Sequence, residues 1–289
     1  MNKYLNVGLI QTTLHSGIAW PQHLPTLKMN GMESKRIWQE IKSGFFNFKV
    51  LPWDKRPKIV LLPEFSLDDF GEYGITELSK SLGCVIIGGK DFITNISGGK
   101  TYVENKAAVI IPQDWPLDRS ARYAYKFYFG KSFFSNEELE AFNNPLRNFE
   151  PKPSPHMYIL ETGDYGKIGV AICADFFDIE RFVIYKGRIH HLFIIAHNKD
   201  VQSFYFLSEA ISRLVFCNVV ICNTGFFGGS IAFSPYSKLY KRYIYKHEGS
   251  ILFTTQVVSL PVEELDLAQK KDGSVNGVYK SVPPAYTQK

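Results

Sequence analysis

Short apolar runs alternate with helix-like segments along most of the chain. The runs IVLLP, CVIIGG, LFIIAH and VVICNTG are apolar at consecutive positions, which predicts strands that are covered on both faces of a sheet. From this pattern and from the turn residues between the runs, strands are expected at Leu5–Gln11, Lys58–Leu62, Cys84–Lys90, Ala107–Pro112, Tyr123–Tyr128, Met157–Leu160, Lys167–Ile172, Leu192–Ala196, Val219–Asn223, Ser230–Phe233 and Ser250–Val257.

Helical segments lie between many of these strands. They are expected at Leu27–Lys42, Ile75–Leu82, Asp178–Lys186, Gln202–Cys217 and Val262–Lys271. Because strands and helices interleave without a Pro-, Gly- or Ser-rich linker, the sequence predicts a single α/β domain over residues 1–270 with a layered sheet core. Residues 271–289 are polar and contain prolines, so we expect an extended tail that could lie on a neighbouring subunit.

Composition narrows the class of protein. With 45% hydrophobic and 21% charged residues the chain resembles a soluble globular protein, and a formal net charge of +5 does not by itself indicate a nucleic-acid partner. No apolar run approaches the roughly 18 residues of a membrane span, and the N-terminus predicts a first strand rather than a signal peptide. Four cysteines without C-x-x-C spacing, Cys84, Cys173, Cys217 and Cys222, indicate reduced thiols and a cytoplasmic location.

Three stretches place a reactive side chain at the end of a predicted strand. Glu64 follows KIVLLP, Lys126 lies in ARYAYKFYF, and Cys173 ends KIGVAIC. Ligands gather at the carboxyl ends of strands in sheet-based enzymes, so these three residues could converge. A thiol needs a base to become a good nucleophile. We therefore interpret Cys173 as nucleophile and Glu64 as base, with Lys126 and the backbone N–H of Ala174 stabilising an oxyanion.

Each of these residues also has an ordinary structural explanation. A strand-end cysteine can be a small core residue, a glutamate after proline can cap a helix, and a lysine among aromatics can extend its ammonium to water. Their joint occurrence at strand ends favours the catalytic interpretation. Asp175 is interpreted as structural, because its carboxylate can accept backbone N–H groups and hold a strained turn at Cys173.

The same stretches resemble motifs of the nitrilase superfamily, the carbon–nitrogen hydrolases. LPEFSL resembles the Glu motif, YAYKFYF the Lys motif and GKIGVAICADFFD the Cys motif, in the expected order. The likeness begins at NVGLIQTTL and ends with EGSILFTTQVVSLPVEELDLAQ, so it covers the chain to about residue 270. It implies a four-layer α-β-β-α sandwich that assembles into dimers or larger homo-oligomers through faces beside the active site.

The resemblance also implies supporting residues. Members often carry a second glutamate beside the lysine, and Glu137, eleven residues after Lys126, fits that role. Glu137 could equally be a favourable charge at a helix N-terminus. In the family the loop that holds IAHN commonly contacts substrate, which makes His197 and Asn198 candidate substrate-binding residues, with a turn role as the alternative.

The sequence departs from the family pattern around these motifs. An aromatic residue commonly follows the cysteine, where this chain has Ala174, and a histidine commonly follows the lysine, where it has Phe127. No particular substrate can therefore be transferred. Lys131, in FGKSFF, is the alternative catalytic lysine if the loop is shifted. Lys126 is preferred because it ends the strand-like run.

Two weaker patterns concern metals and nucleic acids. The pair His190–His191 has no third ligand at useful spacing and is expected at the surface, so no metal is predicted, and the triad needs no cofactor. The tract SKLYKRYIYKHE interleaves basic and aromatic residues, a pattern that nucleic-acid-binding proteins use. Because no nucleic-acid motif accompanies it, a nucleic-acid partner is not expected. The tract could instead contact another protein.

These observations predict a thiol-dependent hydrolase of non-peptide C–N bonds. Its substrate would be a small amide, nitrile or N-carbamoyl compound, and Cys173 would carry a thioester intermediate. An N-acyltransferase that passes the acyl group to another amine would use the same residues. A different alternative is a binding, scaffold or sensor module of a larger assembly with little turnover. The retention of nucleophile, base and lysine favours the enzyme.

Overall fold

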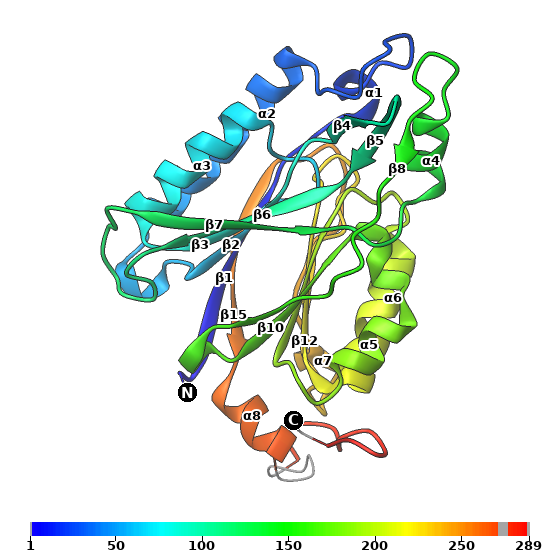
Figure 1. Cartoon of the computed structure of the whole chain (residues 1–289). Helices are drawn as coiled ribbons and strands as arrows, with labels where there is room; N and C mark the ends of the chain where they lie inside the picture. The colour runs from blue at the N-terminus through cyan, green and yellow to red at the C-terminus, as the bar shows by residue number, and fades with distance from the viewer. Residues whose placement is uncertain (1, 271–276, 288–289) are drawn as a thin grey trace.

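Two six-stranded sheets lie face to face in the computed structural model (Figure 1), which describes residues 2–270 and 277–287. The first sheet has the strand order β15-β1-β2-β3-β6-β7 and the second β14-β13-β12-β11-β10-β9. The first sheet consists of β1 (Tyr4–Gln11), β2 (Ile59–Leu61), β3 (Val85–Gly89), β6 (Lys106–Pro112), β7 (Ala124–Gly130) and β15 (Thr254–Pro261). The second consists of β9 (Ile159–Glu161), β10 (Lys167–Ile172), β11 (His191–Ala196), β12 (Asn218–Asn223), β13 (Ile231–Phe233) and β14 (Tyr243–Lys246).

Helices cover the outer face of each sheet. The helices α2 (Gly31–Lys49) and α3 (Asp69–Leu82) pack on the first sheet, and α5 (Ile179–Tyr185) and α6 (Val201–Ile211) pack on the second. The arrangement is the predicted four-layer α-β-β-α sandwich. The remaining helices are α1 (Ser16–Ala19), α4 (Asn136–Phe142), α7 (Leu239–Arg242) and α8 (Glu263–Lys270). None of the helices in the described ranges is both long and apolar enough to cross a bilayer.

The predicted strands agree with the observed ones except near their ends, but β14 and one further group of strands were not predicted. The chain also forms a small third sheet from β4 (Ile93–Ser97), β5 (Lys100–Glu104) and β8 (Glu150–Pro151). β4 is exposed along almost its whole length, so it lacks the apolar pattern that predicts a strand. The helix α2 begins at Gly31 rather than at Leu27, because the side chain of Asn30 caps its first turn.

Strand direction brings several strand ends to one edge of the sandwich. β1, β2 and β3 run parallel to one another, as do β10, β11 and β12. β7 is separated from β3 by two antiparallel pairings, through β6, and so it runs in the same direction as β2. The residues that follow the carboxyl ends of β2 and β7 therefore lie at the same edge, where catalytic groups of sheet enzymes are usually found.

The described part of the C-terminal tail packs against its own chain. Tyr279 is buried, stacks on Tyr236 at a centroid distance of 4.8 Å and joins a small apolar cluster around Phe216. The predicted extended tail therefore folds back in this part. Residues 271–276 and 288–289 lie outside the described residues, and the domain boundary at residue 270 stays a prediction.

Candidate active site

Cys173 lies directly after β10 in a strained backbone conformation. It begins the short 3₁₀ helix Cys173–Phe177 and has a φ of +43°, in the left-handed region. Phe65, directly after Glu64, has a φ of +62°. Such conformations cost of order 1–3 kcal/mol in non-glycine residues and concentrate at functional sites. The predicted strained turn at the cysteine is thus present, and the chain turns sharply at both candidate reactive positions.

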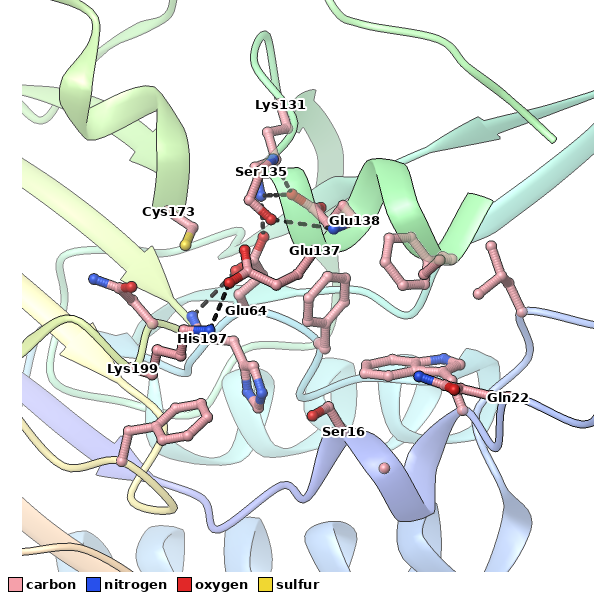
Figure 2. A pocket seen from close by; sticks show the side chains of 18 of the residues that line it. Ser16, Gln22, Glu64, Lys131, Ser135, Glu137, Glu138, Cys173, His197 and Lys199 are labelled. Atoms are coloured by element: carbon pink, nitrogen blue, oxygen red, sulfur yellow. Dashed lines mark hydrogen bonds and ion pairs between the residues drawn. The ribbon is translucent and has the colours of Figure 1, made fainter. Parts of the chain in front are cut away.

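Glu64, Lys131, Glu138 and Asn105 form a buried polar cluster beside the cysteine, and Figure 2 labels the first three of them. The Nζ of Lys131 donates to Oε1 of Glu64 at 2.8 Å and to Oε2 of Glu138 at 2.6 Å. The Nδ2 of Asn105 donates to Oε1 of the same two glutamates, at 2.8 and 2.9 Å. Lys131 and Glu64 are each only 1% exposed. Two carboxylates thus share one ammonium and one amide, which fixes the position of all four groups.

The pKa values of the Cys173 thiol and of the Lys131 ammonium are both raised in this cluster. Burial, together with the negative charge of Glu64, raises the pKa of Cys173 well above its usual value of 9.0, although Lys131 opposes the rise. Burial alone would lower the pKa of Lys131, but Glu64 and Glu138 outweigh it and the pKa rises. At neutral pH the site therefore holds a protonated thiol beside a permanent cation.

Asp175 ties the cysteine turn to the loop that follows β7. Its Oδ1 accepts the backbone N–H groups of Ser132 and Phe133, each at 2.9 Å, and its Oδ2 lies 3.4 Å from the backbone nitrogen of Ile172. Arg181 lies 3.5 Å from the same carboxylate. These contacts agree with the structural role predicted for Asp175, and they hold Cys173 and Lys131 in a fixed relation.

The structure does not bring Lys126 to this cluster. Its side chain is 40% exposed and pairs with Glu72 of α3, because even-numbered positions of β7 face the helix layer whereas Phe127 and Phe129 face the second sheet. β7 also continues to Gly130, so Lys126 is not the strand-end residue. The prediction that Lys126 lies beside Glu64 and Cys173 is wrong, and Lys131, the alternative lysine, occupies that place.

The second glutamate of the cluster is Glu138 rather than Glu137. Ser135 caps α4 in a capping box, in which the Glu138 side chain accepts the Ser135 N–H at 2.8 Å. This contact turns Glu138 back toward Lys131. Glu137 is exposed and forms an ion pair of 2.7 Å with Lys199, whose hydrogen bond lowers the pKa of Glu137. Glu137 lines the cavity mouth but does not contact Lys131.

Asn105 was not among the site residues predicted from the sequence. Asn105 lies between β5 and β6, is 1% exposed, and accepts the backbone N–H of Lys131 through its backbone carbonyl oxygen at 2.9 Å. A lone asparagine before an apolar strand usually predicts a turn, so the sequence offered no reason to place Asn105 in an active site. The S-x-x-E pattern from Ser135 to Glu138 was the available sign that Glu138 turns back toward the preceding loop.

The remaining predicted site residues all lie near the cluster. The backbone N–H of His197 donates to Oε2 of Glu64 at 3.1 Å, while both ring nitrogens of His197 are buried without a hydrogen-bond partner in the described part of the chain. Burial lowers the pKa of His197 to about 4, so the ring is neutral. The backbone of Asn198 exchanges hydrogen bonds with the side chain of Asn223, and the Asn198 side chain accepts the backbone N–H of Asp200 at 3.1 Å, a contact typical of turns. Ala174 is the second residue of a short helix, where N–H groups lack an intrahelical acceptor.

His190 and His191 are buried rather than at the surface, where they were expected. His190 lies 3.2 Å from Oδ1 of Asp266, and His191 contacts the carbonyl oxygen of Tyr165 at 3.0 Å. These contacts give both rings a structural role. Among the described residues no group of three histidine, cysteine, aspartate or glutamate side chains is arranged to hold a metal ion.

The cluster opens into a cavity of about 350 Å³. Cys173, Glu64, Lys131 and Glu138 line it at one place, and Figure 2 shows Gln22 across the cavity from Cys173. Other lining residues are Trp20, Leu27, Phe65, Phe92, Ala141, Arg147, Asn198, Lys199 and Phe227. This volume lies at the lower end of the range for small-molecule sites. The thiol, the base and the cation therefore face a space that suits a compact substrate.

The fold is shared with solved structures of carbon–nitrogen hydrolases. Nit3 from Saccharomyces cerevisiae, a member of branch 10 of the nitrilase superfamily, aligns with a TM-score of 0.62 and 14% identity over 96% of this chain and 97% of its own. A CN-hydrolase superfamily protein from Xanthomonas campestris gives 0.61 and 13% over 93% and 95%. An amidase from Nesterenkonia sp. gives 0.60 and 11% over 92% and 94%.

Sequence comparison adds no further relative. No protein-family model matches the chain, and no curated protein matches it. At identities of 11–14% the structural likeness shows the fold alone. The chain thus has the fold of the nitrilase superfamily, which is the fold predicted from its motifs.

Proposed function

We propose that this protein is a carbon–nitrogen hydrolase that cleaves small amides through a thioester on Cys173. The observation that carries the proposal is the buried cluster of Glu64, Lys131 and Glu138 around the cavity that also contains the sulfur. Burying two carboxylates with one ammonium costs desolvation energy, and a catalytic role gives a reason for the chain to keep this cluster. Nucleophile, base and cation are the parts that acyl transfer to a thiol requires.

The first half of the reaction forms the thioester. The Sγ of Cys173 attacks the amide carbon while its proton passes to Glu64, so that an S–C bond forms and the carbonyl oxygen gains the negative charge. Lys131 and the N–H of Ala174 stabilise that oxyanion. When the intermediate collapses, the C–N bond breaks and Glu64 gives its proton to the nitrogen, which leaves as ammonia.

The second half hydrolyses the thioester. Glu64, again a carboxylate, accepts a proton from water as the water oxygen attacks the thioester carbon. The C–S bond then breaks, and the proton held by Glu64 returns to the sulfur of Cys173. The net change is amide plus water to carboxylic acid plus ammonia, so the protein returns to its starting protonation state.

The charges around the sulfur favour proton transfer during attack over a preformed thiolate. The raised pKa of Cys173 keeps it protonated in the resting state. Proton transfer to Glu64 in the attack step avoids building up a thiolate beside two carboxylates. Asn105 donates to Glu64, and Glu138 accepts from both Asn105 and Lys131, so these contacts keep the base oriented toward the cavity.

A related structure supports the amide class. A variant of the Nesterenkonia amidase carries the acetamide moiety of fluoroacetamide, added covalently at the active-site cysteine. That protein shares the fold of this chain at 12% identity. By analogy, an amide-bearing electrophile is a suitable probe for Cys173, and the likeness of fold makes the small-amide class the first to test.

Assembly into a homo-oligomer remains a prediction, which one surface feature supports. Ile179 and Val183 are spaced four residues apart on α5, so they share one face of the helix, and they are 75% and 70% exposed. Exposed apolar side chains of this kind often mark an interface. We propose that a second copy covers this face, which size-exclusion chromatography of Val183→Asp would test by a shift to a smaller species.

The proposed chemistry is tested by thiol labelling and by ammonia release. Cys84, Cys217 and Cys222 are 0% exposed, so they serve as internal controls when labelling by chloroacetamide is followed site by site with mass spectrometry. Cys173 is expected to react much faster than these three, and Glu64→Gln should slow it. Ammonia released from a panel of small amides should disappear in Cys173→Ala. Slow, equal labelling of all four cysteines would instead favour the scaffold alternative.

A further inference from the structure

One wall of the catalytic cavity is built from three interlocked aromatic rings. The ring centroids of Trp20 and Phe65 are 4.8 Å apart, those of Trp20 and Phe92 are 5.2 Å apart, and those of Phe65 and Phe92 are 4.6 Å apart. All three residues line the cavity, together with Leu27. Gln22, two residues after Trp20, lies across the cavity from Cys173 (Figure 2). A substrate amide held at the sulfur would therefore extend its acyl group toward these rings.

A buried carboxylate holds this wall in place from behind. Asp91 is 7% exposed and accepts three N–H groups: Nε1 of Trp20 at 2.9 Å, the backbone N–H of Phe92 at 2.8 Å and that of Met29 at 2.7 Å. Hydrogen bonds to an ionised acceptor are stronger than neutral ones. The rings are thus fixed by polar contacts as well as by packing, which makes the wall a rigid surface.

The cations of the lining outside the catalytic cluster already have partners, which leaves little to bind a charged acyl group: Lys199 pairs with Glu137 at 2.7 Å. The ring of His197 contacts Phe65 and Phe227 at centroid distances of 6.1 and 5.1 Å and is neutral. Arg147 is a cation in the same lining, but its guanidinium donates to the carbonyl oxygens of Pro21 and Leu24 at 2.8 and 3.0 Å. Arg147 is therefore occupied in holding the chain segment that carries the wall.

We infer that the substrates of this site are primary amides of carboxylic acids with an apolar, ring-sized acyl group. This inference rests on the proposed amidase function and adds the substrate class to it. An apolar cavity of about 150 Å³ is enough to hold a benzene ring, so a volume of about 350 Å³ has room for a ring, the amide and a water molecule. Contact with the wall removes the apolar surface of the ring from water and favours binding.

Turnover of three matched amides tests the inference. Acetamide has no group to reach the wall, phenylacetamide places a ring on it, and succinamate places a carboxylate there. We expect kcat/KM for phenylacetamide to exceed the values for acetamide and succinamate by at least about 100-fold, because a single methylene in an apolar pocket already contributes about 10-fold or more. A kcat/KM for either of the other two that equals or exceeds that for phenylacetamide would overturn it.

Binding to Cys173→Ala separates this inference from the proposed function. The variant keeps the aromatic wall but lacks the nucleophile, so titration calorimetry measures recognition without chemistry. Phenylacetamide is expected to bind at least about tenfold more tightly than acetamide or succinamate. Equal affinities would overturn the substrate class even if amides are hydrolysed. If wild type releases no ammonia from any of the amides but this binding preference is present, the hydrolase proposal fails and the binding site stands.

Substitutions of the wall residues test whether the aromatic wall causes the preference for phenylacetamide. Phe92→Ala should lower the ratio of kcat/KM for phenylacetamide to that for acetamide by about tenfold or more. Phe70→Ala is the matched control, since Phe70 is 64% exposed on α3 and lies outside the cavity lining. If Phe92→Ala folds poorly, Trp20→Phe serves as the second wall variant. It retains a ring, so it should lower the same ratio by a smaller factor. An unchanged ratio in both wall variants would refute the assignment.

Discussion

Two lysines five residues apart offer a matched test of the site. Lys131 is 1% exposed and pairs with both Glu64 and Glu138, whereas Lys126 is 40% exposed and pairs with Glu72. Replacing Lys131 with methionine keeps a similar length but leaves two buried carboxylates without a cation. Removing one partner of a buried ion pair costs about 3–5 kcal/mol of unfolding free energy. The same change at Lys126 breaks a solvent-screened pair and should cost at most about 1 kcal/mol.

Lys131→Met should lose more activity and more stability than Lys126→Met. Loss of one oxyanion-stabilising group lowers kcat by about 10²–10³-fold, so Lys131→Met should lose at least that much ammonia release, while Lys126→Met retains most of it. Urea unfolding of the two variants at one pH gives the stability. Equal losses of activity and stability in the two variants would show that Lys131 neither stabilises the oxyanion nor holds the two glutamates.

Three further predictions concern the residues that hold the site. Burial raises the pKa of Asp91 from 3.8 to about 6, so the folded state binds the proton more tightly than the unfolded state. Stability contributed by this group should then be present below pH 3.8 and fall by roughly 3 kcal/mol as the pH rises through about 6; urea titrations of wild type and Asp91→Asn should show this slope only in wild type. Asp175→Ala should cost about 1–3 kcal/mol by leaving buried N–H groups unpaired and should slow chloroacetamide labelling of Cys173, and normal labelling would contradict its positioning role. A Cβ at Gly89 would lie 2.4 Å from the Cα of Glu64, so Gly89→Ala should displace the base and reduce kcat by about tenfold or more. The control Gly31→Ala, whose Cβ meets no atom within 4 Å, should leave kcat unchanged.

The order and type of the main elements were predictable from local sequence. Strands covered on both faces need continuous apolar runs, and β10 spans Lys167–Ile172, the predicted range. Exposed elements were not predictable in this way, because β4 has no buried face to impose a pattern. The likeness of motifs to the nitrilase superfamily supplied the four-layer arrangement, which the fold confirms.

The positions of Glu64 and Cys173 were also accessible from the sequence. Each residue directly follows an apolar run, so recognising the strand in that run is enough to place the residue at a strand end. The backbone strain at Cys173 was anticipated from the abrupt change of pattern at that residue. A carboxylate two residues later, Asp175, accepts backbone N–H groups as expected.

Tertiary structure decided which lysine and which glutamate join them. The local sequence favoured Lys126, but the pairing of β7 with β6 extends the strand to Gly130 and turns Lys126 toward α3. Likewise, helix phase set by the Ser135 cap directs Glu138 inward and leaves Glu137 in solvent. Neighbouring residues of one type are chemically equivalent in a sequence. The direction of a side chain, by contrast, follows strand register and helix phase, which contacts with distant segments determine.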